Sequence, residues 1–213
     1  MTSSTSLFIE FALEKKVLQF GDFLTKAGRN SPYFFNLGAF NDGESLKRLG
    51  EFYANKIIET KIEFDMIFGP AYKGIPLVST LSIALSNKSK NIPYSFNRKE
   101  AKDHGEGGEI IGSPIKGNVL VIDDVISAGT SINESYKLIH NNGAKISGVI
   151  VAIDRQEQGE NKLSATQEIA KKYSIPIISI INLEDIIKYL ETTNGLINEL
   201  ELIKKYQDSY GVI

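Results

Sequence analysis

Short apolar runs alternate with longer helix-like segments between residues 64 and 180. The runs are rich in Val and Ile, which is typical of strands buried on both faces of a parallel sheet. The segments between them repeat apolar residues at the spacing of one helix face. This alternation predicts an α/β fold, in which a mostly parallel central sheet is flanked by helices. In chain order, the elements are expected at residues 64–68, 74–86, 92–96, 119–122, 130–142, 145–154, 163–173 and 177–180.

The two ends of the chain have a different pattern. Two helical patterns flank residues 20–36, where aromatic strand formers surround a turn-forming stretch, so we expect a β-hairpin there. The second of these helices, at about 45–60, has one apolar stripe and is expected to pack on the core sheet. Two more helical patterns close the chain. We therefore expect an N-terminal helix and hairpin hood (1–60), an α/β core (61–181) and C-terminal helices packed on the core (182–213).

Residues 98–109 fit neither pattern. They have no hydrophobic period and no apolar anchor, and they combine three cations, one histidine and three glycines. Long loops of this kind within compact domains are usually lids or disordered inserts. Two interpretations fit this segment equally well. It is either a mobile lid at 98–113 that closes on an anion, or a solvated loop whose charges have no function.

Composition narrows the class of protein further. With 213 residues, 42% of them hydrophobic, the chain can bury the core of a single domain. A net charge of −2 and a pI near 5.8 predict no binding to nucleic acid or to an anionic membrane, so an anionic ligand would need local cations. The absence of cysteine excludes disulfides and thiolate metal sites. Without a signal sequence or an apolar run of roughly 18 residues, we expect a soluble cytoplasmic protein.

The stretch 119–131 carries the strongest chemical signal. It places Asp123 and Asp124 after a buried strand and follows them with a hydroxyl-rich glycine turn before a helix. In open α/β sheets ligands bind at such carboxyl edges, and the N–H groups of a helix N-terminus bind phosphate. The carboxylates would repel a phosphate but accept hydrogen bonds from the vicinal hydroxyls of a ribose. One Asp alone would equally cap the helix, but the full pattern favours a phosphorylated sugar.

The same stretch resembles a known motif. The chain contains neither G-x-x-x-x-G-K-[ST] nor G-x-G-x-x-G. An apolar strand, Asp-Asp, small residues and Gly-Thr instead resemble the phosphoribosyl pyrophosphate (PRPP) motif of type I phosphoribosyltransferases. Residues 25–36, 69–77 and 98–105 extend the likeness to essentially the whole chain and narrow it to the orotate phosphoribosyltransferases of the compact bacterial kind. Two departures are mild: Ala27 stands where serine is common, and Ser127 where threonine is usual.

The resemblance implies a reaction. The 5-phosphoribosyl group of PRPP would pass to N1 of orotate, giving orotidine 5′-phosphate and pyrophosphate in the biosynthesis of UMP. Magnesium would be the cofactor, held mainly by PRPP with few or no direct protein ligands. A homodimer would follow, in which each lid reaches the active site of the other subunit. Positive charge would develop on the ribose ring, so catalysis would rest on positioning and charge stabilisation.

The resemblance also assigns roles to residues. Catalytic roles fall to Lys102, His104, Asp123 and Asp124. PRPP would contact Lys26, Tyr72, Lys73, Arg98, Lys99, Lys102 and His104, and the run Asp123, Asp124, Val125, Ile126, Ser127, Ala128, Gly129, Thr130 and Ser131. Orotate would contact Lys26, Phe34, Phe35, Ser127 and Arg155. Family members further bend the Ala71-Tyr72-Lys73 turn through a non-proline cis peptide.

Each assignment has a plainer alternative. The turn at 70–74 would also fit an ordinary connection between a strand and a helix. Phe34 and Phe35 would ordinarily be core residues, but neighbours on a strand face opposite ways, so at most one can be buried on the core side. Arg155 would fit a solvated arginine at a strand end as well as a guanidinium fork that reads a carboxylate. His140, on a presumed helix face, is interpreted as structural.

Two other functions share the PRPP motif. One is a phosphoribosyltransferase for uracil or a purine, because the Asp-Asp motif reports only the PRPP half of the reaction. The hairpin with Lys26 and Phe34-Phe35 favours orotate. The other is a PRPP-sensing regulator that binds RNA or DNA. It would need a basic face or a helix-turn-helix extension, and the acidic pI and the lack of a spare N-terminal domain argue against both.

Overall fold

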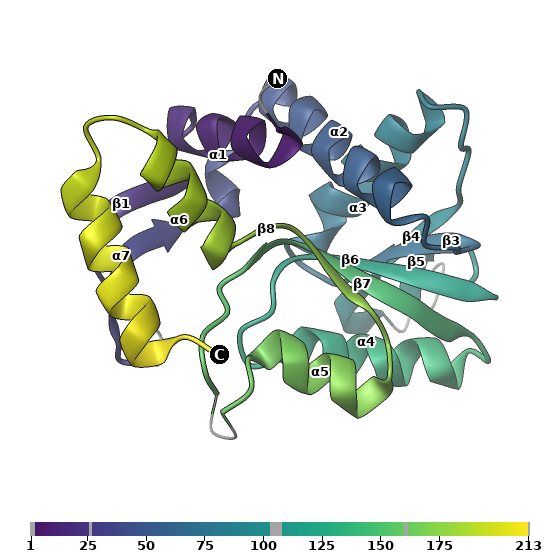
Figure 1. Ribbon diagram of the computed structural model, residues 1–213. Helices are drawn as coiled ribbons and strands as arrows, with labels where there is room; N and C mark the ends of the chain where they lie inside the picture. The colour runs from purple at the N-terminus through teal and green to yellow at the C-terminus, as the bar shows by residue number, and fades with distance from the viewer. Residues whose placement is uncertain (1–2, 26, 103–107, 160–161, 213) are drawn as a thin grey trace.

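A six-stranded sheet forms the centre of the molecule (Figure 1). The computed structural model describes residues 3–25, 27–102, 108–159 and 162–212, without the side chains of residues 100–102. Within these ranges the strand order is β5-β4-β3-β6-β7-β8, and every pairing is parallel except that of β4 with β5. The mostly parallel sheet predicted from the sequence is therefore confirmed. The strands are β3 (Met66–Gly69), β4 (Tyr94–Lys102), β5 (Gly108–Gly112), β6 (Asn118–Val125), β7 (Lys145–Asp154) and β8 (Ile177–Asn182).

Helices cover both faces of this sheet (Figure 1). α2 (Gly43–Thr60) and α3 (Gly74–Ser86) lie on one face, and α4 (Thr130–Asn141) and α5 (Ala165–Tyr173) lie on the other. Each face of the sheet has its own hydrophobic core, and successive residues of a strand contribute to opposite cores. In β6, Leu120 and Ile122 belong to one buried cluster, and Val119 and Val121 belong to the other. No helix among the described residues is both long and apolar enough to cross a membrane.

The connections diverge between β3 and β6. β3 leads through α3 to β4 along one face, whereas β6 leads through α4 to β7 along the opposite face. This makes the gap between β3 and β6 a topological switch point, the place where open α/β sheets bind their ligands. Two loops meet at its carboxyl edge. They are the β3–α3 turn at residues 70–73 and the β6–α4 turn at residues 126–129.

A smaller layer lies beside the sheet edge formed by β8 (Figure 1). β1 (Leu18–Leu24) and β2 (Asn30–Phe35) form the expected antiparallel hairpin after α1 (Ser4–Glu14), and a short 3₁₀ turn (Leu37–Ala39) leads from it to α2. α6 (Leu183–Thr192) contacts α1 and β8, and α7 (Ile197–Tyr210) contacts β2. The C-terminal helices therefore join the hood to the core, and α2 packs with α3 on the sheet.

Two expectations need correction. Residues 98–102 and 108–109, expected as part of a loop, lie in β4 and β5. These strands pair at the sheet edge through backbone hydrogen bonds, so they need no hydrophobic period. Asp123 and Asp124, expected after the strand, lie within β6, because its pairing with β7 continues as far as Val125 and Ile153.

The close packing of α2 on α3 gives a stability prediction. A Cβ atom on Gly50 would lie 2.7 Å from both the carbonyl oxygen and Oγ1 of Thr80. We expect Gly50→Ala to lower the free energy of unfolding by about 1–3 kcal/mol, because the helices must separate. Gly43→Ala, in the same helix with no atom within 4 Å of the added carbon, serves as the control. Equal thermal midpoints for the two variants would contradict this packing.

Candidate active site

Two carboxylates are buried at the carboxyl end of β6. Asp123 and Asp124 are only 6% and 7% exposed, although β6 ends at the sheet edge. Asp123 Oδ2 accepts a hydrogen bond from Ser131 Oγ at 2.8 Å, and its Oδ1 accepts one from the backbone N–H of Asp124 at 2.9 Å. The hydroxyl of the buried Tyr53 donates to the backbone oxygen of Asp123 at 2.9 Å. Contacts from two helices thus fix the position of this residue.

Burial changes the acidity of this pair. It raises the pKa of the Asp123 carboxyl to about 6, and the negative charge of Asp124 adds to the rise. The hydrogen bond from Ser131 opposes it, because a donor stabilises the ionised form. Near neutral pH Asp123 is therefore an ionised acceptor whose charge is incompletely compensated by the protein.

Asp124 has a cationic partner from the other loop of the switch point. Lys73 Nζ, at the start of α3, forms an ion pair with Asp124 Oδ2. The lysine side chain is 60% exposed, whereas that of Asp124 is 9% exposed. The family resemblance predicts that Lys73 contacts PRPP. The structure adds that its ammonium group joins the β3–α3 turn to the end of β6.

The β6–α4 turn presents a helix N-terminus to solvent. Ser127, Ala128 and Thr130 are exposed, and among the described residues no side chain caps the first turn of α4. Gly129 has φ +70°, and a Cβ atom there would lie 2.8 Å from Cδ1 of Ile169. Only glycine fits this bend without strain. The first turn of α4 therefore keeps N–H groups without a side-chain cap, which is the feature that the predicted phosphate site requires.

The β3–α3 turn is tied to β4. The peptide bond between Ala71 and Tyr72 is cis, which confirms the expectation from the family resemblance. The backbone N–H of Ala71 donates to Asn97 Oδ1 at 2.8 Å, so this N–H group already has a partner within the protein. Lys99 Nζ lies 5.3 Å from the centre of the Tyr72 ring. No pattern in the sequence indicated a role for Asn97.

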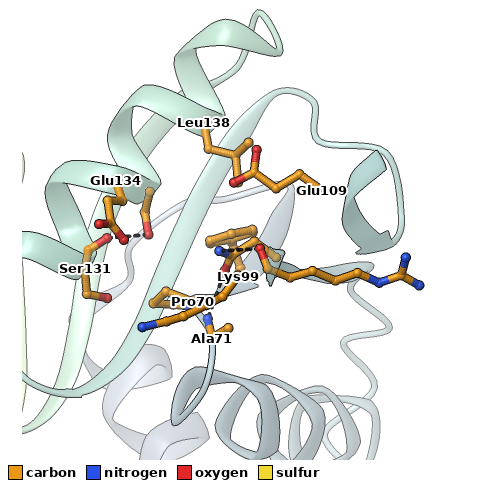
Figure 2. A pocket seen from close by; sticks show the side chains of 11 residues that line it. Pro70, Ala71, Lys99, Glu109, Ser131, Glu134 and Leu138 are labelled. Carbon is orange, nitrogen blue, oxygen red and sulfur yellow. Dashed lines mark hydrogen bonds between the residues drawn. The ribbon is translucent and has the colours of Figure 1, made fainter. Parts of the chain in front are cut away.

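A cavity of about 260 Å³ lies beside this turn (Figure 2). Figure 2 shows Ser131 and Glu134 of α4 on one side and Pro70, Ala71 and Lys99 across from them. Arg98 also lines the cavity. Two cations from β4, the carboxylates of Glu109 and Glu134, and the Ser131 hydroxyl that donates to Asp123 therefore border one space. The contact of Arg98 and Lys99 with PRPP stays a prediction.

The hairpin presents one aromatic side chain outward. Tyr33 is fully buried, Phe35 is half-buried, and Phe34 is 42% exposed. Phe34 stacks on Phe23 of the neighbouring strand, with 5.3 Å between ring centres. The alternation predicted for Phe34 and Phe35 is confirmed.

Arg155 is not a solvated arginine. Its side chain is 20% exposed and forms an ion pair with Glu157. Nη2 also donates to Ser31 Oγ at 3.1 Å, and the guanidinium carbon lies 4.2 Å from the centre of the Tyr33 ring. Burial alone would lower the pKa of Arg155, but Tyr33 and Glu157 raise it, so the group stays charged. Glu157 and Ser31 had no signal in the sequence.

The sheet register places Arg155 close to the PRPP motif. Val125 of β6 pairs with Ile153 of β7. Ser127 and Arg155 each follow two residues later, so the two chain segments leave the sheet at the same level. His140, interpreted as structural, is exposed on α4 and stacks on Tyr136.

Three predicted site residues are not placed by the structure. Lys26 and His104 lie outside the described residues, as does the side chain of Lys102. Their assignments remain predictions from the family resemblance.

Known proteins share this sequence and architecture. The family described as "Phosphoribosyl transferase domain" matches residues 36–177. A protein of Nitrosomonas europaea named orotate phosphoribosyltransferase is 57% identical over 96% of this chain and 90% of its own length. One of that name from Thiobacillus denitrificans is 52% identical over the full length of both chains. The crystal structure of orotate phosphoribosyltransferase from Francisella tularensis has a TM-score of 0.88 and 42% identity, covering 96% of this chain and 99% of that one.

The raised pKa of Asp123 predicts how stability depends on pH. Because the folded-state pKa of Asp123 is about 6 against an ordinary 3.8, the ionisation of this one buried carboxyl contributes a loss of stability as pH rises from 3.8 through 6. An asparagine at this position would not titrate. The free energy of unfolding of Asp123→Asn, relative to that of the wild type, should therefore rise by about 2 kcal/mol from pH 4 to pH 7.5. Urea unfolding at both pH values measures this gain. Asp208→Asn, on the exposed surface of α7, is the control. A stability difference independent of pH would contradict the buried ionised state.

Proposed function

Because the chain belongs to the orotate phosphoribosyltransferase family, we propose that the switch-point site around Asp123 and Asp124 binds PRPP and carries out the transfer. The protein transfers the 5-phosphoribosyl group from PRPP to N1 of orotate, and it forms orotidine 5′-phosphate and pyrophosphate in pyrimidine biosynthesis. One observation carries the assignment of the site: two buried carboxylates lie directly before an uncapped helix N-terminus at the carboxyl edge of the sheet.

The two loops divide PRPP between them. The 5-phosphate binds at the N-terminus of α4, where the exposed turn offers N–H groups and hydroxyls. The ribose hydroxyls donate to the carboxylates of Asp123 and Asp124. The pyrophosphate then lies toward the β3–α3 turn, where Lys73 and the cations bordering the cavity in Figure 2 compensate its charge.

The site stabilises the transition state by charge. The bond between ribose C1 and the pyrophosphate oxygen breaks, and a bond from orotate N1 to C1 forms. Positive charge develops on the ribose ring in between, and the incompletely compensated carboxylate of Asp123 lies at the ring's hydroxyls. Lys73 exchanges its ion pair with Asp124 for one with the leaving pyrophosphate. Catalysis therefore rests on positioning and on preorganised charge.

We propose Mg²⁺ as the cofactor. Carboxylate oxygens of Asp123 and Asp124 are the hard donors that Mg²⁺ prefers. In the described ranges no three Asp, Glu or His side chains gather at one point, so oxygens of PRPP would supply most of the ligands, and Asp123 and Asp124 would contribute few direct contacts or none. When bound, the ion would neutralise charge on the pyrophosphate and improve it as a leaving group.

Orotate is proposed to bind between the hairpin and the β6–α4 turn. The exposed face of Phe34 suits a planar ring, and Ser127 offers a hydroxyl at the sheet edge. Arg155 is charged and partly open to solvent, and it leaves the sheet at the level of Ser127, so it suits the orotate carboxylate. Lys26 and Phe35 complete the proposed set.

We also propose a homodimer with shared active sites in the cytoplasm. The proposal rests on the family resemblance, in which cations of residues 98–104 act in the site of the other subunit. Its support in this chain is the concentration of Arg98, Lys99, Lys102 and His104 in one segment of an otherwise acidic protein.

Substrate choice is tested by turnover with a panel of bases. With PRPP and Mg²⁺, we expect kcat/KM for orotate to exceed that for uracil, adenine and hypoxanthine by at least about a hundredfold, because a charged pocket rejects bases without the carboxylate. Chelation of Mg²⁺ should abolish turnover, and added Mg²⁺ should restore it. Preference for another base would reassign the substrate, and PRPP binding without any turnover would indicate a regulator.

Sharing of sites between subunits is tested by mixing two inactive variants. Lys102→Ala has an intact ribose site, and the Asp123→Asn/Asp124→Asn variant has an intact Lys102. If Lys102 acts across the interface, each heterodimer regains one complete site, and random exchange should restore about a quarter of the wild-type activity. No recovery despite proven subunit exchange would show that Lys102 acts within its own chain.

A further inference from the structure

Glu157 lies among donors from three separate parts of the chain. Its Oε1 atom accepts hydrogen bonds from Arg155 Nε at 2.7 Å and from the hydroxyl of Tyr206, on α7, at 2.9 Å. Its Oε2 atom lies 3.9 Å from Nη1 of Arg29, which follows the tip of the hairpin. The Glu157 side chain is 17% exposed. One carboxylate therefore connects the end of β7, the hairpin and the C-terminal helix.

These contacts leave only one edge of the Arg155 guanidinium available. Nε and Nη2 face Glu157, and Nη2 also donates to Ser31. The ring of Tyr33 covers one face of the group. Among the hydrogen bonds and ion pairs of the described residues, none uses Nη1 of Arg155, so this edge is the one that can reach a ligand.

We propose that Glu157 is the positioning residue for Arg155, holding its guanidinium so that the Nη1 edge meets the orotate carboxylate. This inference rests on the proposed orotate site. Glu157 contacts no substrate in this arrangement. It acts through the orientation and charge of Arg155, and so it sets the preference for an acceptor that carries a carboxylate.

Electrostatics explain why the orientation depends on Glu157. Arg29 and Arg155 both approach its carboxylate, so its removal would leave two guanidinium groups near each other in a partly buried place. Arg29 has other anchors, since Nη2 donates to the Gln158 carbonyl at 2.8 Å and the group lies 4.9 Å from the centre of the Tyr210 ring. Arg155 is therefore the group that would turn away.

The backbone around Glu157 is fixed independently. The Gln158 N–H donates to the carbonyl of Tyr210 at 2.7 Å, and the Val212 N–H donates to the carbonyl of Gln156 at 2.8 Å. A change of the Glu157 side chain should therefore leave the chain path in place. We therefore expect a substitution of Glu157 to change the recognition of orotate more than it changes the stability of the fold.

The test compares orotate with uracil in a double-mutant cycle. Glu157→Gln keeps the shape and one acceptor oxygen but removes the charge. We expect it to raise KM for orotate about tenfold, with little change in KM for PRPP and in kcat/KM for uracil, or for a neutral orotate analogue if uracil turnover is undetectable. Arg155→Ala should lower the orotate preference at least as much, and the double variant should match Arg155→Ala. Glu191→Gln, which removes an exposed ion pair with Lys204, is the matched control.

The possible outcomes distinguish the role of Arg155 from the role of Glu157. An unchanged orotate preference in Arg155→Ala would overturn the proposed role of Arg155, and the role of Glu157 with it. Suppose instead that Arg155→Ala lowers the orotate preference. If Glu157→Gln then has no effect, or if its effect adds fully to that of Arg155→Ala in the double variant, the positioning role of Glu157 alone would be overturned. If Glu157→Gln does not fold, Tyr206→Phe removes one hydroxyl from the same carboxylate. That variant should raise KM for orotate about two- to fivefold, and an unchanged KM would overturn the proposal.

Discussion

Asp123 and Asp124 are held almost out of solvent at the end of β6, and most contacts of the site follow from that burial. A buried carboxylate is costly unless donors compensate it, so each acid has a partner: Ser131 donates to Asp123, and Lys73 pairs with Asp124. These partners come from α4 and from the start of α3, which lie on opposite faces of the sheet. Satisfying two charges thus fixes the relative position of the two loops that are proposed to bind PRPP.

Local sequence patterns predict the helices and strands whose formation depends on residues that are neighbours in the chain. The α3 helix begins and ends where the apolar period places it, at Gly74 and Ser86. The buried β6 strand and the hairpin follow equally from local pattern and turn chemistry. The strand structure of residues 98–102 and 108–109 was missed because strands at a sheet edge need only backbone pairing, so no hydrophobic period marks them in the sequence.

The site could be predicted only in part, for a related reason. The Asp-Asp pair and its glycine turn are contiguous, so their chemistry can be read along the chain. The supporting residues are not. Asn97 reaches Ala71 across 26 positions, and Tyr53 reaches Asp123 across 70. No local pattern marks such contacts, because they depend on how α2, β3, β4 and β6 are packed together.

The edge strand β5 and its partner β4 have a consequence beyond catalysis. β5 is the outermost strand on its side of the described sheet, and an exposed strand edge invites pairing with another molecule. Here the edge carries Glu109, while β4 beside it contributes Arg98 and Lys99. Charged side chains at such an edge oppose the intermolecular stacking of strands that leads to aggregation. The segment that is proposed to bring cations to the pyrophosphate would then also oppose aggregation through this edge of the sheet.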